Sequence, residues 1–111
     1  MRVIVGQEGA VTVVKPIGPV VSGDLEELDQ ALFKLFNRWS KRIVINMTDV
    51  VFVDSAGLEL LNRYSRMFSS HGLKLKLCGL NEMTRKILDL TQLSRRFEIF
   101  ADTSTSIRSF L

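Results

Sequence analysis

The first segment of the chain alternates short apolar runs with residues that favour turns. Residues Arg2 to Val5 and Ala10 to Val14 are rich in β-branched side chains, and the sequence Gly-Gln-Glu-Gly separates them. Glycines suit a tight hairpin turn, so this pattern predicts two antiparallel strands. Residues 15–23 then contain two prolines and two glycines. This composition predicts the end of a strand followed by a loop, and not a central strand or a helix.

A helical period follows that loop. Apolar residues recur at three- and four-residue intervals, which predicts an amphipathic helix with one face against a core. Asp24 precedes this stripe, and Glu27 stands three residues later, as in a capping box. We therefore expect the helix to begin at Asp24. The apolar stripe consists of Leu25, Leu28, Leu32, Leu35, Phe36 and Trp39.

A second helical pattern begins near Ser55. Its expected apolar face carries Leu58, Leu61, Tyr64 and Phe68, and its expected polar face carries Glu59, Arg63 and Arg66. Gly72 is suited to the left-handed conformation that ends many helices, and His71 in the last turn suits the negative end of the helix dipole. We therefore expect this helix to end at His71 and Gly72.

Three further apolar runs predict strands. Residues Lys41 to Met47 are almost continuously apolar after the first two, which is typical of a central parallel strand buried on both faces. Leucines alternate with lysines in residues 74–78, which predicts a strand with one wet face. The Phe-Glu-Ile-Phe sequence of residues 97–100 predicts a last short strand.

A third helix is expected between the last two strands. Asn81 is placed to cap it, and it carries Met83, Ile87 and Leu90. The serine- and threonine-rich tail is expected to add one or two helical turns. Met47, Met67 and Met83 lie in apolar patterns typical of a core, and Cys78 is expected to be buried and inert.

The order of these elements predicts an α/β fold with right-handed crossovers between parallel strands. The 111 residues and 12.6 kDa fit one domain, residues 1–111. One cysteine and one histidine allow neither an internal disulfide nor a structural zinc site, which indicates a reducing compartment. No apolar run approaches the roughly 18 residues of a membrane span. We expect a soluble, cytoplasmic protein.

Enzyme chemistry finds little support in these residues. A Ser-His-Asp triad would need Ser55, His71 and Asp54, but the Asp-Ser-Ala-Gly-Leu sequence is not a nucleophile elbow. Neither a dinucleotide-binding nor a Walker A glycine motif is present. We therefore predict a protein that is not an enzyme and that needs no cofactor or metal.

The turn between the central strand and the second helix, residues 51–60, carries the candidate chemistry. Asp54 and Ser55 lie at the amino end of the helix, where backbone amides lack partners and the helix dipole is positive. Either residue can act as a structural cap. The hydroxyl of Ser55 can also accept a phosphate. The helix amides tolerate the charge of this phosphate, whereas an acidic or apolar partner docked on the same surface would be repelled. Both interpretations are compatible.

The residues Asp54 to Leu58, together with the length and element order of the whole chain, resemble the STAS domain family, in particular its anti-sigma factor antagonists. The resemblance implies a right-handed βα superhelix without catalytic activity. The expected fold has a mixed, mostly parallel sheet and an N-terminal antiparallel hairpin. The resemblance also implies that an anti-sigma factor with serine kinase activity phosphorylates Ser55 and that a phosphatase reverses this. The unphosphorylated form would bind the kinase and release the sigma factor.

The expected docking surface follows the start and the exposed face of the second helix. Gly57 would let the backbone of a partner approach closely, and Glu59 would place a negative charge in the first turn. The partner-binding residues would be Asp54, Ala56, Gly57, Leu58, Glu59, Asn62, Arg63 and Arg66. We expect a monomer or a weak dimer, with no direct insertion into a membrane.

Three alternatives remain open. One is a STAS subunit that is not phosphorylated and that assembles or regulates a larger complex, such as a lipid transport ATPase. A receiver domain of a response regulator is disfavoured, because only Glu8 is acidic near the first strand and no lysine follows the last one. A nucleic-acid binder is disfavoured because the net charge is only +3 and the arginines and lysines lack interleaved exposed aromatic residues.

Overall fold

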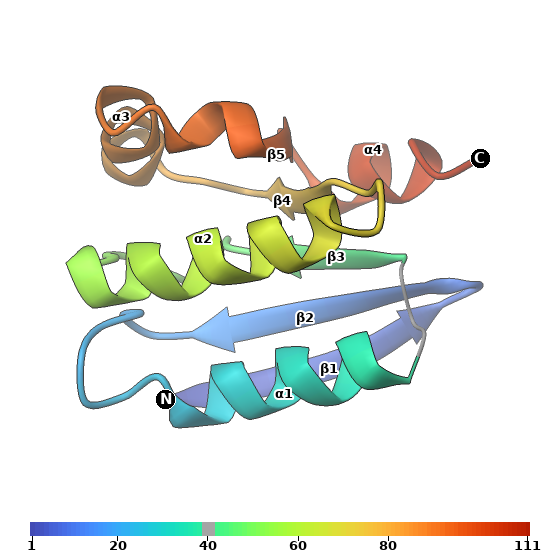
Figure 1. Ribbon diagram of the computed structural model, residues 1–111, viewed down its shortest axis with the longest axis horizontal. Helices are drawn as coiled ribbons and strands as arrows, with labels where there is room; N and C mark the ends of the chain where they lie inside the picture. The colour runs from blue at the N-terminus through green and yellow to red at the C-terminus, as the bar shows by residue number, and fades with distance from the viewer. Residues whose placement is uncertain (39–41) are drawn as a thin grey trace.

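The computed structural model describes residues 1–38 and 42–111. Its sheet has five strands in the order β1-β2-β3-β4-β5 (Figure 1). The strands β1 and β2 are antiparallel, whereas β2 to β5 run parallel to one another. This arrangement confirms the predicted α/β class, the mostly parallel sheet and the N-terminal hairpin. The elements are β1 (Arg2–Glu8), β2 (Val11–Ile17), α1 (Glu26–Asn37), β3 (Ile43–Asn46), α2 (Ser55–Ser69), β4 (Leu75–Cys78), α3 (Glu82–Leu90), a 3-10 helix η1 (Leu93–Arg96), β5 (Phe97–Phe100) and α4 (Thr103–Arg108).

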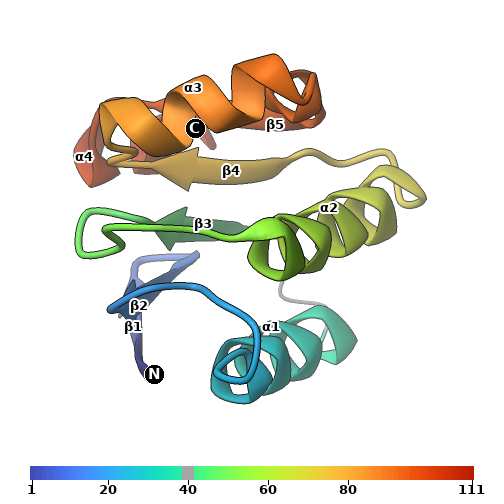
Figure 2. The ribbon, with the colours of Figure 1, turned by 90° about the vertical axis from the view of Figure 1, so that its left-hand side faces the viewer.

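Helices cover both faces of the sheet. Figure 2 shows α1 and α2 on one side and α4 on the other. The larger core lies under α1, α2 and α3 and includes Leu28, Leu61 and Leu88, one from each helix. A smaller core lies on the α4 side around Val44 of β3. Because β3 is buried from both sides, the predicted central strand is confirmed.

The hairpin is longer than the sequence pattern predicts. Glu8 pairs with Val11, so the turn is Gly9-Ala10, and Gly6 lies inside β1. Residues 15–17 form the end of β2, where Pro16 pairs with Val3, and the loop follows, as the sequence pattern predicts. Pro16 is an even number of residues from Thr12, whose backbone nitrogen faces β3, so the nitrogen of Pro16 faces the same side. Only residues 12–14 of β2 pair with β3, so no ladder bond is lost at Pro16.

The predicted cap of α1 is wrong. Leu25 is the N-cap residue and makes no side-chain capping bond. The carboxylate of Asp24 is instead paired with the amino group of Met1. The predicted apolar face is confirmed at Leu28 and Leu32, which are buried. Trp39 and Lys41 lie outside the described residues.

The lysine face of β4 is not wet, because α4 covers it. Lys76 is only 7% exposed. Its Nζ donates a hydrogen bond to Ser109 Oγ at 2.6 Å and lies 3.9 Å from the ring centroid of Phe110. Alternation within one strand identifies two faces but cannot show that a later helix packs on the second.

The cap of α3 is confirmed, but the expectation that Met83 belongs to the core is wrong. Asn81 accepts a hydrogen bond from the amide of Thr84 at 2.8 Å. Thr84 and Leu88 face the core, whereas Met83 and Leu90 are 56% and 74% exposed. The short helix therefore packs through a narrower stripe than its apolar content indicates. None of the helices in the described part of the chain has the length and apolar character needed to cross a membrane.

Candidate functional site

The site forms where two loops meet at the carboxyl ends of β2 and β3. Val20 of the β2–α1 loop forms an isolated parallel bridge with Val53 of the β3–α2 loop. The amide of Val20 donates to the carbonyl of Phe52 at 2.9 Å, and the amide of Asp54 donates to the carbonyl of Val20 at 3.2 Å. These bonds fix the turn that precedes α2.

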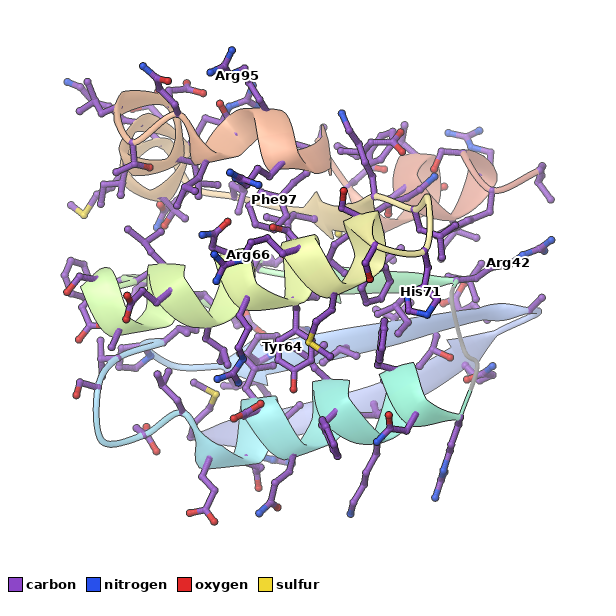
Figure 3. The ribbon with its side chains drawn as sticks, viewed as in Figure 1. Arg42, Tyr64, Arg66, His71, Arg95 and Phe97 are labelled. Atoms are coloured by element: carbon purple, nitrogen blue, oxygen red, sulfur yellow. The ribbon has the colours of Figure 1, made fainter. Side chains whose placement is uncertain are left out.

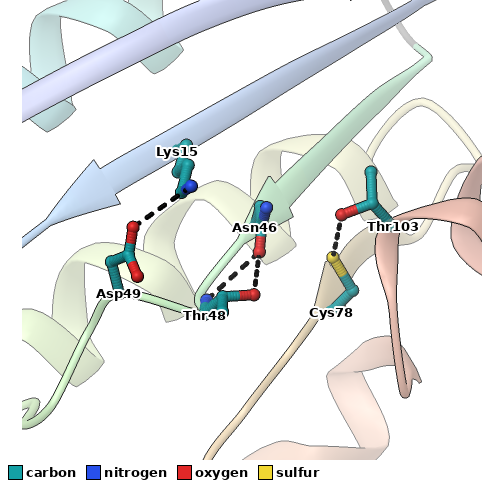
Figure 4. Close-up of polar contacts among 6 residues, drawn as sticks. All are labelled: Lys15, Asn46, Thr48, Asp49, Cys78 and Thr103. Carbon is teal, nitrogen blue, oxygen red and sulfur yellow. Dashed lines mark hydrogen bonds and ion pairs between the residues drawn. The ribbon is translucent and has the colours of Figure 1, made fainter.

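Polar side chains also hold the start of the β3–α2 loop (Figure 4). Lys15 of β2 forms an ion pair with Asp49 at 3.1 Å. Asn46 at the end of β3 accepts a hydrogen bond from the amide of Thr48 at 3.1 Å. The loop is therefore anchored to both of the strands that lead into the site.

Asp54 is the N-cap of α2, which confirms its structural role. Its Oδ1 accepts a hydrogen bond from the amide of Gly57, and its Oδ2 accepts one from the amide of Ser22, each at 2.9 Å. The Ser22 amide and then the Gly57 amide hold the pKa of this carboxyl below its usual range, because they stabilise its charged form. One side chain thus caps the helix and joins it to the β2–α1 loop.

We expect the Asp54→Asn variant to be less stable than the native protein at neutral pH, with a smaller difference in acid. The asparagine oxygen can still cap α2, but its NH₂ group cannot accept the bond from Ser22. Because the pKa in the folded state is lowered, the stabilisation is fully present above about pH 3.9 and is lost as the pH falls through the folded-state pKa. Urea unfolding of both proteins between neutral pH and pH 2 measures this. A difference that does not change with pH would contradict the assignment.

Ser55 is the first residue of α2 and is exposed. Within the described part of the chain, its hydroxyl has no hydrogen-bond partner. The predicted acidic residue in the first turn is wrong, since Glu59 lies in the second turn and the first contains none. The negative charge next to Ser55 in the chain is therefore that of Asp54. A phosphate on Ser55 would add its charge at the residue next to that carboxylate.

Gly57 does not have the role that the sequence pattern predicts. It is buried, and a Cβ at this position would lie 2.3 Å from the carbonyl oxygen of Val20 and 2.8 Å from a methyl group of Val53. The close approach that the glycine permits is therefore to the loop of its own chain and not to a partner. The glycine brings α2 against Val20 and so sets the position of Ser55.

The exposed face of α2 forms one wall of a groove against α1. The groove has a volume of about 490 Å³. Five of the predicted contact residues line it, whereas Leu58 packs half-buried against the core. The lining residues are Leu25, Asp29, Ala56, Glu59, Leu60, Asn62, Arg63 and Arg66.

A polar link between α1 and α2 supports this groove. Arg63 forms an ion pair with Asp29 at 2.7 Å. The hydroxyl of Tyr64, which lies between the two helices in Figure 3, donates to Asp29 Oδ1 at 2.6 Å. Burial and then this bond raise the pKa of Tyr64. Arg63 is therefore held in place by α1 as well as exposed to solvent.

Three exposed apolar side chains, in the loop before α2 and in the first turn of α3, are missing from the predicted site. Val51 and Phe52 are 66% and 42% exposed in the loop before α2, and Met83 is 56% exposed in the first turn of α3. Asn81 joins these segments, because its side-chain amide donates to the carbonyl of Val51 at 3.1 Å. Apolar residues usually indicate a core, so the sequence pattern hid them. Val50 and Val53 are buried, whereas Val51 and Phe52 between them are exposed to solvent.

The fold and the site define a small α/β domain that presents an exposed serine at the start of a helix. Within the described residues, no group of histidine, cysteine and acidic side chains could hold a metal ion. The family model of the STAS domain matches residues 2–106. The chain therefore belongs to the STAS domain family.

Solved structures share this fold. TM1081 from Thermotoga maritima, proposed to be an anti-sigma factor antagonist, is 21% identical with a TM-score of 0.89, over 96% of this chain and 92% of that one. An anti-sigma factor antagonist from Mycobacterium paratuberculosis is 20% identical with a TM-score of 0.83, over 97% and 92%. Phosphorylated SpoIIAA from Bacillus is 15% identical with a TM-score of 0.77, over 99% and 100%. Among curated proteins, no match is found.

Proposed function

We propose that this protein is a non-catalytic anti-sigma factor antagonist that is switched by phosphorylation of Ser55. In this proposal the unphosphorylated form binds an anti-sigma factor with serine kinase activity, and a phosphatase restores that form. The observation that carries the proposal is the exposed Ser55 hydroxyl, which has no partner among the described residues and stands at the start of a rigidly held helix. SpoIIAA, which shares the fold, is known in a phosphorylated form.

The surroundings of Ser55 suit a switch based on charge. Val51 and Phe52 precede it and offer apolar area that a partner can bury. A phosphate would add nearly two negative charges beside Asp54. Both carboxylate oxygens of Asp54 already accept backbone hydrogen bonds, so Asp54 cannot turn away without leaving the Ser22 or Gly57 amide unpaired. The phosphorylated surface would therefore repel an apolar or acidic partner.

The partner would contact the surface that runs from the loop before α2 along the groove against α1. Glu59, Arg63 and Arg66 supply charges of both signs there, which suits a partner with a specific charge pattern. Asp54 borders this surface, and Ala56 and Asn62 lie within it, while Gly57 and Leu58 support it from beneath. Val51, Phe52 and Met83 extend the proposed surface on the apolar side.

The test is to map phosphorylation on the protein isolated from its own cells in growing and stressed cultures. We expect phosphate on Ser55 at an occupancy that changes with condition. The purified protein should also be incubated with ATP and the serine-kinase anti-sigma factors of the same organism, one at a time. The partner kinase should add one phosphate. The Ser55→Ala variant should stay unmodified. An unmodified Ser55 in every condition, on well-covered peptides, would contradict the switch and favour a constitutive STAS subunit of a larger complex.

A further inference from the structure

The strand β1 is a long open edge of the sheet. Figure 2 shows it at one end of the sheet, and among the described residues no strand pairs with its outer side. All of β1 except the half-buried Val3 is exposed, including Ile4 at 44% and Val5 at 48%. The opposite edge, β5, has four residues, whereas β1 has seven. Open edges usually carry a proline, a lysine or a bulge that prevents pairing, and β1 has none of these.

The register of the hairpin shows which backbone groups of β1 face the open edge. The amide of Thr12 in β2 donates to Arg42, on the β3 side. The backbone groups of the odd-numbered residues of β2 therefore bond to β1. Their partners in β1 are the even-numbered residues. The N–H and C=O groups of Val3, Val5 and Gln7 consequently point outward. These groups form a template for one more antiparallel strand.

The sequence of β1 is complementary to itself in that geometry. When two copies of β1 pair antiparallel around Val5, each Val5 lies opposite the other, and Val3 lies opposite Gln7. These are the residues whose backbone groups face outward, so the hydrogen bonds match. Arg2 then lies opposite Glu8 of the second copy at both ends, with the side chains on the same face. Opposite charges at such positions stabilise paired strands.

The helix beside β1 has the same distribution of charge. The helix α1 runs in the same direction as β1 (Figure 1). Between them is a groove of about 300 Å³ that is lined by Val3, Val5 and Ala31, with Glu27 near the start of the helix and Lys34 and Arg38 near its end. The two-fold axis that pairs the strands would bring the acidic end of one α1 toward the basic end of the other.

We infer that β1 is the contact strand of a symmetric homodimer, in which it pairs antiparallel with β1 of a second copy around Val5. The inference does not depend on the proposed function. Ser55 follows β3, two strands from this edge, so the dimer leaves the candidate site open. One strand and one helix face make a small interface, so the dimer dissociates on dilution.

The first test is sedimentation equilibrium of the native protein and of the Val5→Pro variant, from about 10 μM to about 1 mM. We expect the native protein to change from monomer to dimer across this range. The proline removes an N–H group that faces outward, so the variant should bind itself at least about tenfold more weakly with its fold intact. The Lys74→Glu variant, which changes an exposed lysine before β4, is the control and should dimerise normally. A native protein that stays monomeric, or a Val5→Pro variant that dimerises equally well, would overturn the inference.

Charge reversal tests the register and does not depend on the proline variant folding. Arg2→Glu and Glu8→Arg should each weaken self-association about tenfold or more, because like charges then face each other at both ends. An equimolar mixture of the two variants should restore dimers. In the mixed dimer, the introduced glutamate of one variant faces the introduced arginine of the other, and the remaining Arg2 and Glu8 face each other at the opposite end. Dimers that the single changes leave intact, or that mixing does not restore, would overturn the β1 register.

Discussion

Replacing Gly57 with alanine is expected to lower the free energy of unfolding by about 3 kcal/mol, near the upper end of the cost of overpacking a core. The new Cβ would lie 2.3 Å from the carbonyl oxygen of Val20, far inside van der Waals contact. That carbonyl also accepts the amide of Asp54. The β2–α1 loop must therefore move, and the bond that orders the start of α2 is stretched. The cause is steric, because Gly57 has an ordinary helical φ.

Equilibrium urea unfolding measures this effect, with Gly6→Ala as the matched control. Gly6 also has an ordinary φ, and a Cβ there meets nothing within 4 Å. We expect Gly6→Ala to leave the stability unchanged or to raise it slightly, because alanine restricts the unfolded chain. A Gly57→Ala protein as stable as Gly6→Ala would show that the Val20 loop yields without cost. The glycine would then not position Ser55.

Phosphorylation of Ser55 is expected to weaken binding to the anti-sigma factor about a hundredfold, which corresponds to about 3 kcal/mol. The phosphate would bring nearly two negative charges into a contact that otherwise buries Val51 and Phe52, and it would stand on the residue next to Asp54. The Ser55→Asp variant carries one added charge, and we expect about a tenfold loss. The Ser55→Ala variant should bind as the native protein does.

Calorimetric titration of these proteins with the anti-sigma factor tests the switch. Ser69→Asp is the matched control, because Ser69 is an exposed serine at the other end of α2. It adds the same charge to the same helix and should leave the affinity unchanged. If Ser55→Asp bound as tightly as Ser55→Ala, phosphorylation would not act through charge at this contact. Equal losses in Ser55→Asp and Ser69→Asp would indicate a general effect on the helix.

The elements of this fold were predictable where local periodicity and burial agree. The run from Ile43 to Ile45 is apolar because both faces of β3 are covered, and the stripe of α2 faces a single core. Asp54 was predictable as a capping residue because its oxygen satisfies a helix amide three residues later. These are interactions between residues close in sequence, or patterns that burial imposes on one element.

The failures occurred where distant segments decide the environment. Lys76 alternates with leucines as a solvent-facing residue would, but α4 arrives from the end of the chain to cover it. Met83 looks apolar enough for a core, yet α3 presents it to solvent. Asp24 stands where a cap is expected, but its carboxylate pairs with the amino group of Met1 instead. No local pattern contains the partner in any of these cases.

The amino-acid pattern determined the order of strands and helices, the central strand and the serine at the start of α2, because hydrophobic period and capping act over a few residues. The tertiary structure decided what surrounds that serine. It joined Ser22 to Asp54, placed Gly57 against Val20 and left Val51 and Phe52 exposed. Each of these depends on two loops meeting at the ends of parallel strands, and crossover helices separate such strands in sequence.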